Sequence, residues 1–359
     1  MERSGDSPLF IPALPGWPRE IGGVAVDNPI WLAPLAGISF GSFRRFHRMR
    51  GAGLVHTEMV SALGLLYKGR KTKELLYGDE GEAPCVLQIF GSEADDVARG
   101  AETALSIRGF EAIEVNMACP MPKVTKKGAG SKLMESPRKA ADMMRLLKSL
   151  GLPVWAKVRL SPHGEGMLST ADFCQELFGG GADFIFVHGR TPAQRYEGRA
   201  SRGAVGEIAR LYPGRIGGSG DCYSPEDLID YLERGCAAVL AARGVLRDAC
   251  LIARTLRELG AELPAELYDP TPEAQADILL ELGASIYNNE GESLALMIAK
   301  RMLGALFRGF AGASRLRRDG ATAGSWEEME RLLRGWRASA ASMNKSEFFS
   351  DADASEDKI

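Results

Sequence analysis

The stretch EVNMACPMPKVTKKGAGSK, residues 114–132, places a cysteine directly after an apolar run of strand length. Asn116 lies near the end of that run, Cys119 stands next to Pro120, and several lysines follow. A cysteine that only fills space in a core is expected inside an apolar run, and Cys119 lies beyond one. The pattern therefore indicates a thiol with a chemical role, the alternative being a small buried residue ahead of Pro120.

A proton-donor role suits this thiol better than a nucleophilic one. A free thiol has a pKa of about 8.5 and is mostly protonated at neutral pH, so it can act as a general acid. Neither a neighbouring histidine nor a Ser–Asp pair follows Cys119 in the sequence, so an activated nucleophile is not indicated.

The cysteine pattern also bears on metals and on the cellular compartment. The six cysteines are scattered, with no C-x-x-C pair. This pattern argues against a zinc or iron–sulfur site and favours a reduced, cytoplasmic protein. No metal is expected. The cysteines are Cys85, Cys119, Cys174, Cys222, Cys236 and Cys250.

The elements that would position Cys119 form a repeating pattern. Apolar runs of strand length alternate with amphipathic stretches such as residues 92–107, 136–150 and 224–235. Nearly continuous apolar strands alternating with helices predict parallel strands buried on both faces. Eight such units favour a (β/α)8 barrel over an open doubly wound sheet. The runs are residues 30–35, 53–59, 85–90, 112–117, 153–159, 183–189, 215–220 and 237–243.

The pattern changes after the eighth run, where only helical periodicities remain. We predict four regions. They are an N-terminal extension that covers the barrel (1–29), the barrel (30–258), a small all-helical domain (259–343) and a disordered acidic tail (344–359). No run of eighteen apolar residues and no signal-peptide pattern is found, so a membrane partner is not expected.

The net charge of −3 conceals an uneven distribution. The tail from residue 345 onward carries five acids and two lysines, whereas residues 300–337 carry nine Lys or Arg against four acids. A basic region on a nearly neutral body is compatible with a polyanionic partner, but taken alone it is better explained as a solvated helix face.

Polar side chains stand at the predicted carboxyl ends of the strands, where barrel enzymes of this type carry their catalytic groups. Each has an ordinary structural alternative, since Gln88 could cap a helix, Lys157 could pair with an acid and His188 could be a loop histidine. The set comprises Glu58, Gln88, Asn116, Cys119, Lys157, Arg159, His188 and Arg190, with GGSG at 217–220 and ARG at 242–244.

Taken together, these residues meet the requirements of a flavin. A lysine stabilises the negative charge that develops at the N1/O2 edge on reduction. Amides such as Gln88 and Asn116 suit the pyrimidine edge. Glycine-rich loops after the last two strands offer backbone N–H groups to a phosphate, with Arg243 as counter-charge.

The chain resembles the dihydrouridine synthases, FMN-dependent enzymes that reduce uridine in tRNA, and it is most similar to the bacterial B-type members. The resemblance runs through roughly residues 25–337. It rests on the segments APLAGISFGSFR (33–44), QIFG (88–91), NMACPMPKVTKKGAGSKLM (116–134), AKVR (156–159), VHGRT (187–191), GGSGDCYSPED (217–227), ARGVL (242–246) and RGFAGASRLRR (308–318).

The resemblance implies a role for each matching residue. Cys119 would protonate C5 of uracil, and reduced FMN, itself reduced by NADPH or NADH, would pass a hydride to C6. The residues implied to bind FMN are Pro34, Leu35, Ala36, Gln88, Asn116, Lys157, His188, Gly218, Ser219, Gly220, Asp221, Ala242, Arg243 and Gly244.

Four positions depart from the family pattern. Ala118 stands where glycine usually precedes the cysteine, and Ser219 where asparagine is usual. Phe40 replaces an aspartate of the first motif, and Met302 replaces a common histidine of the helical domain. The hydroxyl of Ser219 can still hydrogen bond.

The basic residues suit a tRNA partner. A stacked uracil cannot reach a barrel mouth, so the nucleotide must be flipped out. Phosphate contacts then contribute affinity more than sequence choice. The residues expected to contact RNA are Lys123, Lys126, Lys127, Lys132, Arg159, Arg190, Arg301, Arg308, Arg315, Arg317 and Arg318. We expect a monomer that does not bind DNA.

Two alternatives remain open from the sequence. The first is an FMN barrel that acts on a small molecule such as dihydroorotate or an enone, which leaves the lysine loop unexplained. The second is an RNA-binding relative whose catalysis has lapsed through changes such as Ser219 and Phe40.

Overall fold

The computed structural model describes residues 14, 16–78, 80–161 and 168–340. Residues 1–13 and 15 of the predicted N-terminal extension, and the predicted acidic tail at 344–359, lie outside the described residues.

The predicted (β/α)8 barrel is confirmed. Eight parallel strands close on themselves because β4 pairs with both β3 and β6. These strands are β3 (Ile30–Leu32), β4 (Val55–His56), β6 (Cys85–Phe90), β7 (Ala112–Met117), β8 (Val154–Arg159), β9 (Phe184–His188), β10 (Ile216–Ser219) and β11 (Ala238–Ala241). Each overlaps one of the eight predicted apolar runs.

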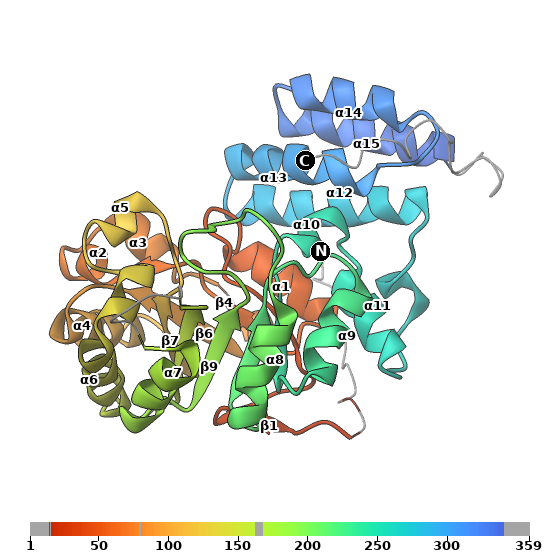
Figure 1. Ribbon diagram of the computed structural model, residues 1–359. Helices are drawn as coiled ribbons and strands as arrows, with labels where there is room; N and C mark the ends of the chain where they lie inside the picture. The colour runs from red at the N-terminus through yellow and green to blue at the C-terminus, as the bar shows by residue number, and fades with distance from the viewer. Residues whose placement is uncertain (1–13, 15, 79, 162–167, 341–359) are drawn as a thin grey trace.

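Helices surround the barrel and continue beyond it (Figure 1). Those of the barrel part are α1 (Gly41–Met49), α2 (Ala62–Leu66), α3 (Arg70–Glu74), α4 (Ala94–Leu105), α5 (Pro122–Thr125), α6 (Pro137–Lys148), α7 (Thr170–Gly179), α8 (Arg202–Leu211), α9 (Pro225–Glu233), α10 (Gly244–Arg247) and α11 (Leu251–Glu258). The 3-10 turns are η1 (Glu80–Glu82), η2 (Gly130–Glu135) and η3 (Ala265–Leu267).

The strand register decides which side chains reach the barrel interior. In β8, Val154, Ala156 and Val158 pack in the hydrophobic cluster shared with the helices. Their neighbours Trp155, Lys157 and Arg159 must therefore point inward, since successive side chains in a strand face opposite sides. If the pairing of β8 shifted by one residue, the inward-facing and helix-facing side chains would exchange places.

The second barrel strand is interrupted. A further short strand, β5 (Val60–Ser61), follows β4, and both pair with β6. Within the break, the Glu58 carboxylate accepts a hydrogen bond from the Gly37 amide. Glu58 thus holds the loop after β3 against the second strand. Burial raises the pKa of its carboxyl, although the Gly37 hydrogen bond and Arg44 act in the opposite direction.

Aromatic rings close the amino-terminal end of the barrel. Trp31 and Trp155 stack with ring centroids 5.4 Å apart and pack with Phe184 and Phe186. A hairpin of β1 (Glu20–Ile21) and β2 (Val24–Ala25) lies below them, where the Trp155 indole N–H donates to the Gly22 carbonyl at 2.8 Å. This apolar floor leaves only the carboxyl end of the barrel for polar chemistry.

The C-terminal part is all-helical. Figure 1 shows its helices stacked on one side of the barrel. Helix α12 contacts α1, and α13 contacts α10, which follows the last barrel strand. The helices are α12 (Pro272–Asn289), α13 (Glu292–Leu306), α14 (Ala313–Thr322) and α15 (Trp326–Ala340). Within the described ranges, no helix combines the length and apolar character needed to cross a bilayer.

The helical part supplies the cap that the start of α1 lacks. Phe40 occupies the N-cap position of α1, and its side chain makes no capping hydrogen bond. Instead Phe40 is buried, and Glu290, which follows α12, accepts a hydrogen bond from the Ser42 amide at 2.9 Å. The side-chain Nδ2 of Asn289 donates to the Ser42 hydroxyl at 3.1 Å. The departure at Phe40 is therefore compensated by a carboxylate from another segment.

Loss of this capping carboxylate should lower the stability of the folded protein measurably. Glu290→Ala removes the acceptor for the Ser42 amide, and losing a helix cap costs about 1 kcal/mol. We expect the free energy of unfolding in urea to fall by about that amount. Glu327→Ala removes an exposed carboxylate of α15 and should change it by less than about 0.5 kcal/mol. Equal effects of the two substitutions would contradict the capping role.

Candidate active site

A cavity of about 1000 Å³, including its open mouth, lies at the carboxyl ends of the strands. Most of the residues predicted to bind a flavin line it. They are Pro34, Leu35, Ala36, Gln88, Asn116, Lys157, His188, Ser219, Gly220, Asp221, Ala242 and Arg243, joined by Cys119 and Arg159. The folding of the barrel therefore brings these segments, which are far apart in the sequence, around one cavity.

Cys119 sits on a turn that is held from several sides. The Asn116 side-chain oxygen accepts hydrogen bonds from the Ala118 and Cys119 amides, at 3.1 and 2.9 Å. Arg159 Nε donates to the Ala118 carbonyl at 2.7 Å, and the Ser131 amide donates to the Cys119 carbonyl at 3.0 Å. Among the six cysteines, Cys119 alone is partly exposed, and the other five are buried.

A glycine is needed beside this turn. Gly130 has a φ of +61°, and a Cβ atom there would lie 2.6 Å from the Cys119 carbonyl oxygen. A side chain at this position would therefore displace the turn that carries the thiol. Gly130, which directly precedes Ser131 after the lysines, thus has a steric role at Cys119.

Lys157 brings a cation to the inner wall of the cavity. Its side chain is buried, and its ammonium group makes no hydrogen bond or ion pair within the described residues. Burial lowers the pKa of Lys157, while the Glu114 carboxylate beneath it acts to raise that pKa. A desolvated ammonium without a partner is suited to interact with a bound anion or electron-rich edge.

The amides of Gln88 and Asn116 form a short chain. Asn116 Nδ2 donates to Gln88 Oε1 at 3.0 Å, and Gln88 Nε2 donates to Glu114 Oε1 at 2.5 Å. Glu114 is fully buried on β7 and does not line the cavity. Sequence reasoning treated residue 114 only as part of an apolar run, although a charged residue in such a run was a visible signal.

His188 lies on the opposite wall. Its Nδ1 is 3.4 Å from the Ser219 hydroxyl, and its Nε2 is buried with no hydrogen-bond partner among the described residues. Burial, followed by nearby cations such as Lys157 and Arg159, lowers the pKa of His188 to about 2. The imidazole is therefore neutral, and its unpartnered nitrogen is available to a bound group.

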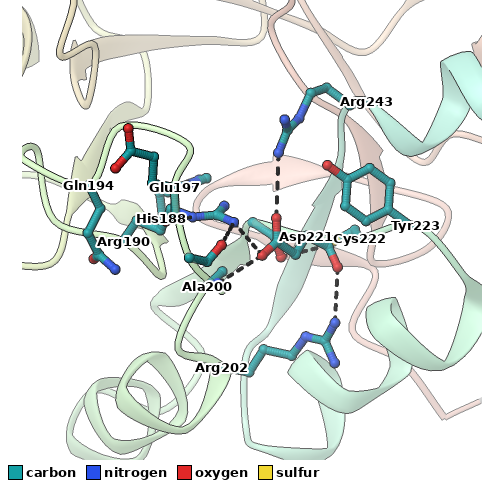
Figure 2. A network of polar contacts seen from close by, with 12 residues as sticks. His188, Arg190, Gln194, Glu197, Ala200, Arg202, Asp221, Cys222, Tyr223 and Arg243 are labelled. Atoms are coloured by element: carbon teal, nitrogen blue, oxygen red, sulfur yellow. Dashed lines mark hydrogen bonds and ion pairs between the residues drawn. The ribbon is translucent and has the colours of Figure 1, made fainter. Parts of the chain in front are cut away.

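Asp221 organises the cations around the rim, as Figure 2 shows. Its carboxylate accepts hydrogen bonds from Arg190 Nη2 at 2.6 Å and from the Ala200 amide at 2.8 Å. Arg243 Nη2 lies 3.5 Å from the same carboxylate, and Arg202 donates to the Asp221 carbonyl. One acid thus orients two arginine side chains.

Two tyrosines that sequence reasoning did not single out line the same side of the cavity. The guanidinium of Arg243 lies 5.0 Å from the ring centroid of Tyr196 and 5.5 Å from that of Tyr223. Tyr196 follows the matching VHGRT segment, and Tyr223 lies within GGSGDCYSPED. Their positions next to those segments were the only available signal. Met59, Pro120 and Cys222 also line the cavity without having been predicted.

Two predicted phosphate-binding glycines do not line the cavity. A Cβ atom at Gly218 would lie 2.3 Å from the Tyr231 ring on α9. At Gly244 it would lie 2.1 Å from the Cys222 carbonyl oxygen. Both glycines therefore permit close packing behind the wall.

The two arginines predicted at the strand ends are not placed where they could grip an RNA backbone. Arg190 is only 2% exposed, and it donates to the Glu197 and Gly198 carbonyls as well as to Asp221. Arg159 is equally buried and donates to the Ala118, Thr191 and Arg195 carbonyls. Both side chains stabilise loops of the rim.

The remaining predicted RNA contacts lie away from the cavity. Lys123 is on α5, and Lys126 and Lys127 follow it, all exposed. Lys132 is exposed and pairs with Glu135 at 2.6 Å. In the helical part, Arg301, Arg308, Arg315 and Arg318 are exposed, whereas Arg317 is half-buried and donates to the Phe307 carbonyl. Met302, the departure in this part, is buried in the helical core.

The donors in the cavity fit a planar group that carries an anion. Lys157 and His188 each offer a nitrogen without a partner, and the Arg243 guanidinium stands at the rim. Gln88 and Asn116 add amide edges, and Pro34 with Leu35 adds an apolar surface. Among the described residues, no cluster of three or more His, Cys, Asp or Glu side chains could hold a metal ion.

Comparisons with known proteins show which family the chain is similar to. The family model for dihydrouridine synthase matches residues 31–341. The probable tRNA-dihydrouridine synthase 1 of Synechocystis sp. is 32% identical over 232 residues, which cover 64% of this chain and 64% of that protein. The tRNA-dihydrouridine synthase B of Pseudomonas aeruginosa is 31% identical, with 83% of this chain and 89% of the relative covered. A mandelate oxidase crystal structure aligns over 73% of this chain and 78% of its own, with a TM-score of 0.45 and 18% identity.

We expect the contribution of Asp221 to the stability of the fold to be lost at low pH. Burial acts to raise the pKa of Asp221, but the Ala200 hydrogen bond and the Arg190 ion pair outweigh it, so its pKa is lowered. A lowered carboxyl pKa stabilises the fold above the unfolded value of about 3.9, and this contribution is lost as pH falls through the folded value. Asp221→Asn keeps a residue that tolerates the positive φ of 49° but removes the charge.

We therefore expect Asp221→Asn to reduce the free energy of unfolding in urea by about 1.5–3 kcal/mol at pH 7. The difference from the unsubstituted protein should narrow as the pH is lowered from 7 to 3. Asp142→Asn, which removes an exposed partner of Arg145, should change stability by less than about 0.5 kcal/mol at either pH. A difference that stays constant with pH would show that the charge of Asp221 is not what stabilises the rim.

Proposed function

Because the chain belongs to the dihydrouridine synthase family, we propose that it reduces uridine in tRNA to 5,6-dihydrouridine, with FMN bound in the cavity and NADPH as the reductant. The observation that carries this proposal is Cys119, the one partly exposed cysteine, which a clamped turn presents at a cavity rich in cations and amides. NADH is the alternative reductant.

The cavity residues can be assigned to parts of FMN by their chemistry. Lys157 would face the edge of the ring where negative charge develops on reduction. Gln88 and Asn116 would hydrogen bond to the amide-like edge, and Pro34, Leu35 and Ala36 would cover one face. Arg243, held by Asp221, would neutralise the phosphate. Ser219 and His188 supply the remaining polar atoms near that end.

The reduction adds a hydride to C6 and a proton to C5, so the C5=C6 double bond of uracil becomes a single bond. When bound, FMN would supply the hydride. Cys119 would supply the proton, since its partly exposed thiol lines the cavity and its S–H can be replenished from solvent. The Asn116 and Arg159 hydrogen bonds keep the thiol-bearing turn in place while the base enters.

Exposed basic residues on two segments that follow barrel strands or contact them through α10 suit a large polyanion. Lys123, Lys126 and Lys127 follow β7, the strand that carries the turn of Cys119. The helical part adjoins α10, which follows β11, and adds exposed arginines such as Arg301 and Arg308. An RNA held at both places would present a flipped nucleotide to the cavity between them.

Cys119→Ala tests the proton-donor role. FMN should stay bound and NADPH should still reduce it, while dihydrouridine formation falls by about 10²–10⁴-fold, the usual contribution of a general acid. The first two quantities are read from flavin absorbance, and the third from mass spectrometry of tRNA. Cys236→Ala removes a buried thiol outside the cavity and should leave all three unchanged. Undiminished dihydrouridine formation in Cys119→Ala would refute the assignment.

The lysines after Cys119 can be tested by the salt dependence of binding. The triple substitution Lys123→Ala, Lys126→Ala and Lys127→Ala should weaken tRNA binding and reduce the slope of log K against log salt by about two to three, because each phosphate contact contributes about one. Dihydrouridine formation at saturating tRNA should change far less than binding.

A matched control removes the same charge from the other end of the barrel. Arg145, Lys148 and Arg210 lie in the last turns of α6 and α8, which run back toward the amino-terminal ends of the strands. Their replacement by alanine should leave the slope unchanged. An equal loss of slope in both triple variants would mean that the chain binds tRNA only through its overall charge.

A further inference from the structure

Glu114 stands at the inner end of a chain of hydrogen bonds that leads to the turn of Cys119. Its Oε1 accepts from Gln88 Nε2, Gln88 Oε1 accepts from Asn116 Nδ2, and Asn116 Oδ1 accepts from the Cys119 amide. All three side chains are buried. The chain therefore connects a carboxyl group below the cavity with the backbone of the thiol-bearing turn.

The donor-to-acceptor direction of this chain of hydrogen bonds depends on Glu114. A side-chain amide can be turned either way, and only its partners decide which atom faces where. The Cys119 amide is a donor, so Asn116 must present its oxygen there and its NH₂ group to Gln88. Gln88 then presents its oxygen to Asn116, and its own NH₂ group needs an acceptor. Glu114 Oε1 is that acceptor, and without it a buried donor would have no partner.

The other oxygen of Glu114 shows that the carboxyl group does not serve as an ordinary ion pair. Glu114 Oε2 lies 3.8 Å from His56 Nε2, too far for a hydrogen bond, and both atoms lack partners within the described residues. His56 Nδ1 lies 2.9 Å from the Leu32 carbonyl and so carries the proton. Burial lowers the pKa of His56 to about 4, so the ring is neutral.

A buried carboxyl group is unfavourable in itself, and burial raises the pKa of Glu114. A neutral His56 offsets little of the cost of burying the Glu114 carboxyl group. The interactions that favour the carboxylate are the hydrogen bond from Gln88 and the nearby Lys157 ammonium group. The hydrogen bond persists in either protonation state of Glu114 because Oε1 accepts in both. The favourable interactions of the Glu114 carboxyl group are therefore made with residues of the cavity wall.

We propose that Glu114 is a positioning residue of the active site, which through Gln88 and Asn116 fixes the atoms that these amides present to the cavity and steadies the turn of Cys119. The inference rests on the proposed function for the meaning of Cys119 and of the amide edges. The hydrogen-bond chain itself can be tested separately from that function.

Two substitutions separate the hydrogen-bond chain from the charge. Glu114→Gln keeps an oxygen for Gln88 Nε2 and turns its NH₂ group toward the unprotonated His56 Nε2, so the chain persists without the charge. Glu114→Met keeps the length of the side chain and removes the acceptor. Val115→Ala is the matched control, because it truncates the neighbouring buried residue of β7 on the helix-facing side. Urea unfolding gives the stability loss of each variant.

The first measurement is the alkylation rate of Cys119 by iodoacetamide in the full-length protein, with and without added FMN. The five other cysteines are buried, and Cys119→Ala gives the background. We expect the rate to rise about five- to tenfold in Glu114→Met. In Glu114→Gln and Val115→Ala it should stay within about twofold of the unsubstituted protein.

The second measurement is the dissociation constant of FMN, followed by quenching of flavin fluorescence. We expect it to rise about tenfold in Glu114→Met, since one buried donor is left without a partner. In Glu114→Gln it should rise by no more than about threefold.

The proposal is overturned if Glu114→Met alkylates no faster than Val115→Ala, or if Glu114→Gln behaves like Glu114→Met. In the second case the charge would matter and the hydrogen-bond chain would not. If Glu114→Met does not fold, Gln88→Leu interrupts the same chain one residue further along and must accelerate alkylation as well. An unsubstituted protein that fails to bind FMN would refute the proposed function, while the alkylation rates would still decide the role of Glu114.

Discussion

The interior of this barrel is a space in which every polar group must find a partner without water, and the arrangement of the active site depends on that constraint. Buried donors and acceptors that lack partners cost free energy. On one wall, Glu114, Gln88 and Asn116 meet the requirement in a single chain that ends at the backbone of Cys119. Of the buried atoms without partners, His188 Nε2 belongs to a residue that lines the cavity, so a bound group can use it.

The charges of the cavity follow from the same constraint. Lys157, Arg159, Arg190 and Arg243 lie in or behind its wall, and Asp221 is the carboxylate that lines it. Arg159 and Arg190 donate to backbone carbonyls, and Arg190 also pairs with Asp221, so both side chains shape the rim. Lys157 and Arg243 face inward and carry the positive charge to the cavity surface. The site is therefore built to hold negative charge.

The helical part is tied to the barrel by the start of α1, next to the loop that lines the cavity. Phe40 cannot cap this helix, and Glu290 from the helical part accepts the hydrogen bond of the Ser42 amide. Arg50 of the barrel also pairs with Glu281 of α12 at 2.8 Å. Through these contacts the proposed RNA-binding helices are joined to the first cavity loop, so a substitution at one end of this contact can affect the other.

The sequence by itself determined the barrel, because alternating apolar strands and amphipathic helices leave few other ways to bury both faces of a parallel sheet. It also singled out Cys119, Lys157 and Asn116, since polar residues that follow apolar runs are visible without coordinates. Only the tertiary structure decided that Arg190 and Gly218 serve packing and the rim, that Tyr196 and Tyr223 flank Arg243, and that Glu114 accepts a hydrogen bond from Gln88. Burial and hydrogen-bond partners come from segments far apart in the chain, and local spacing carries no record of them.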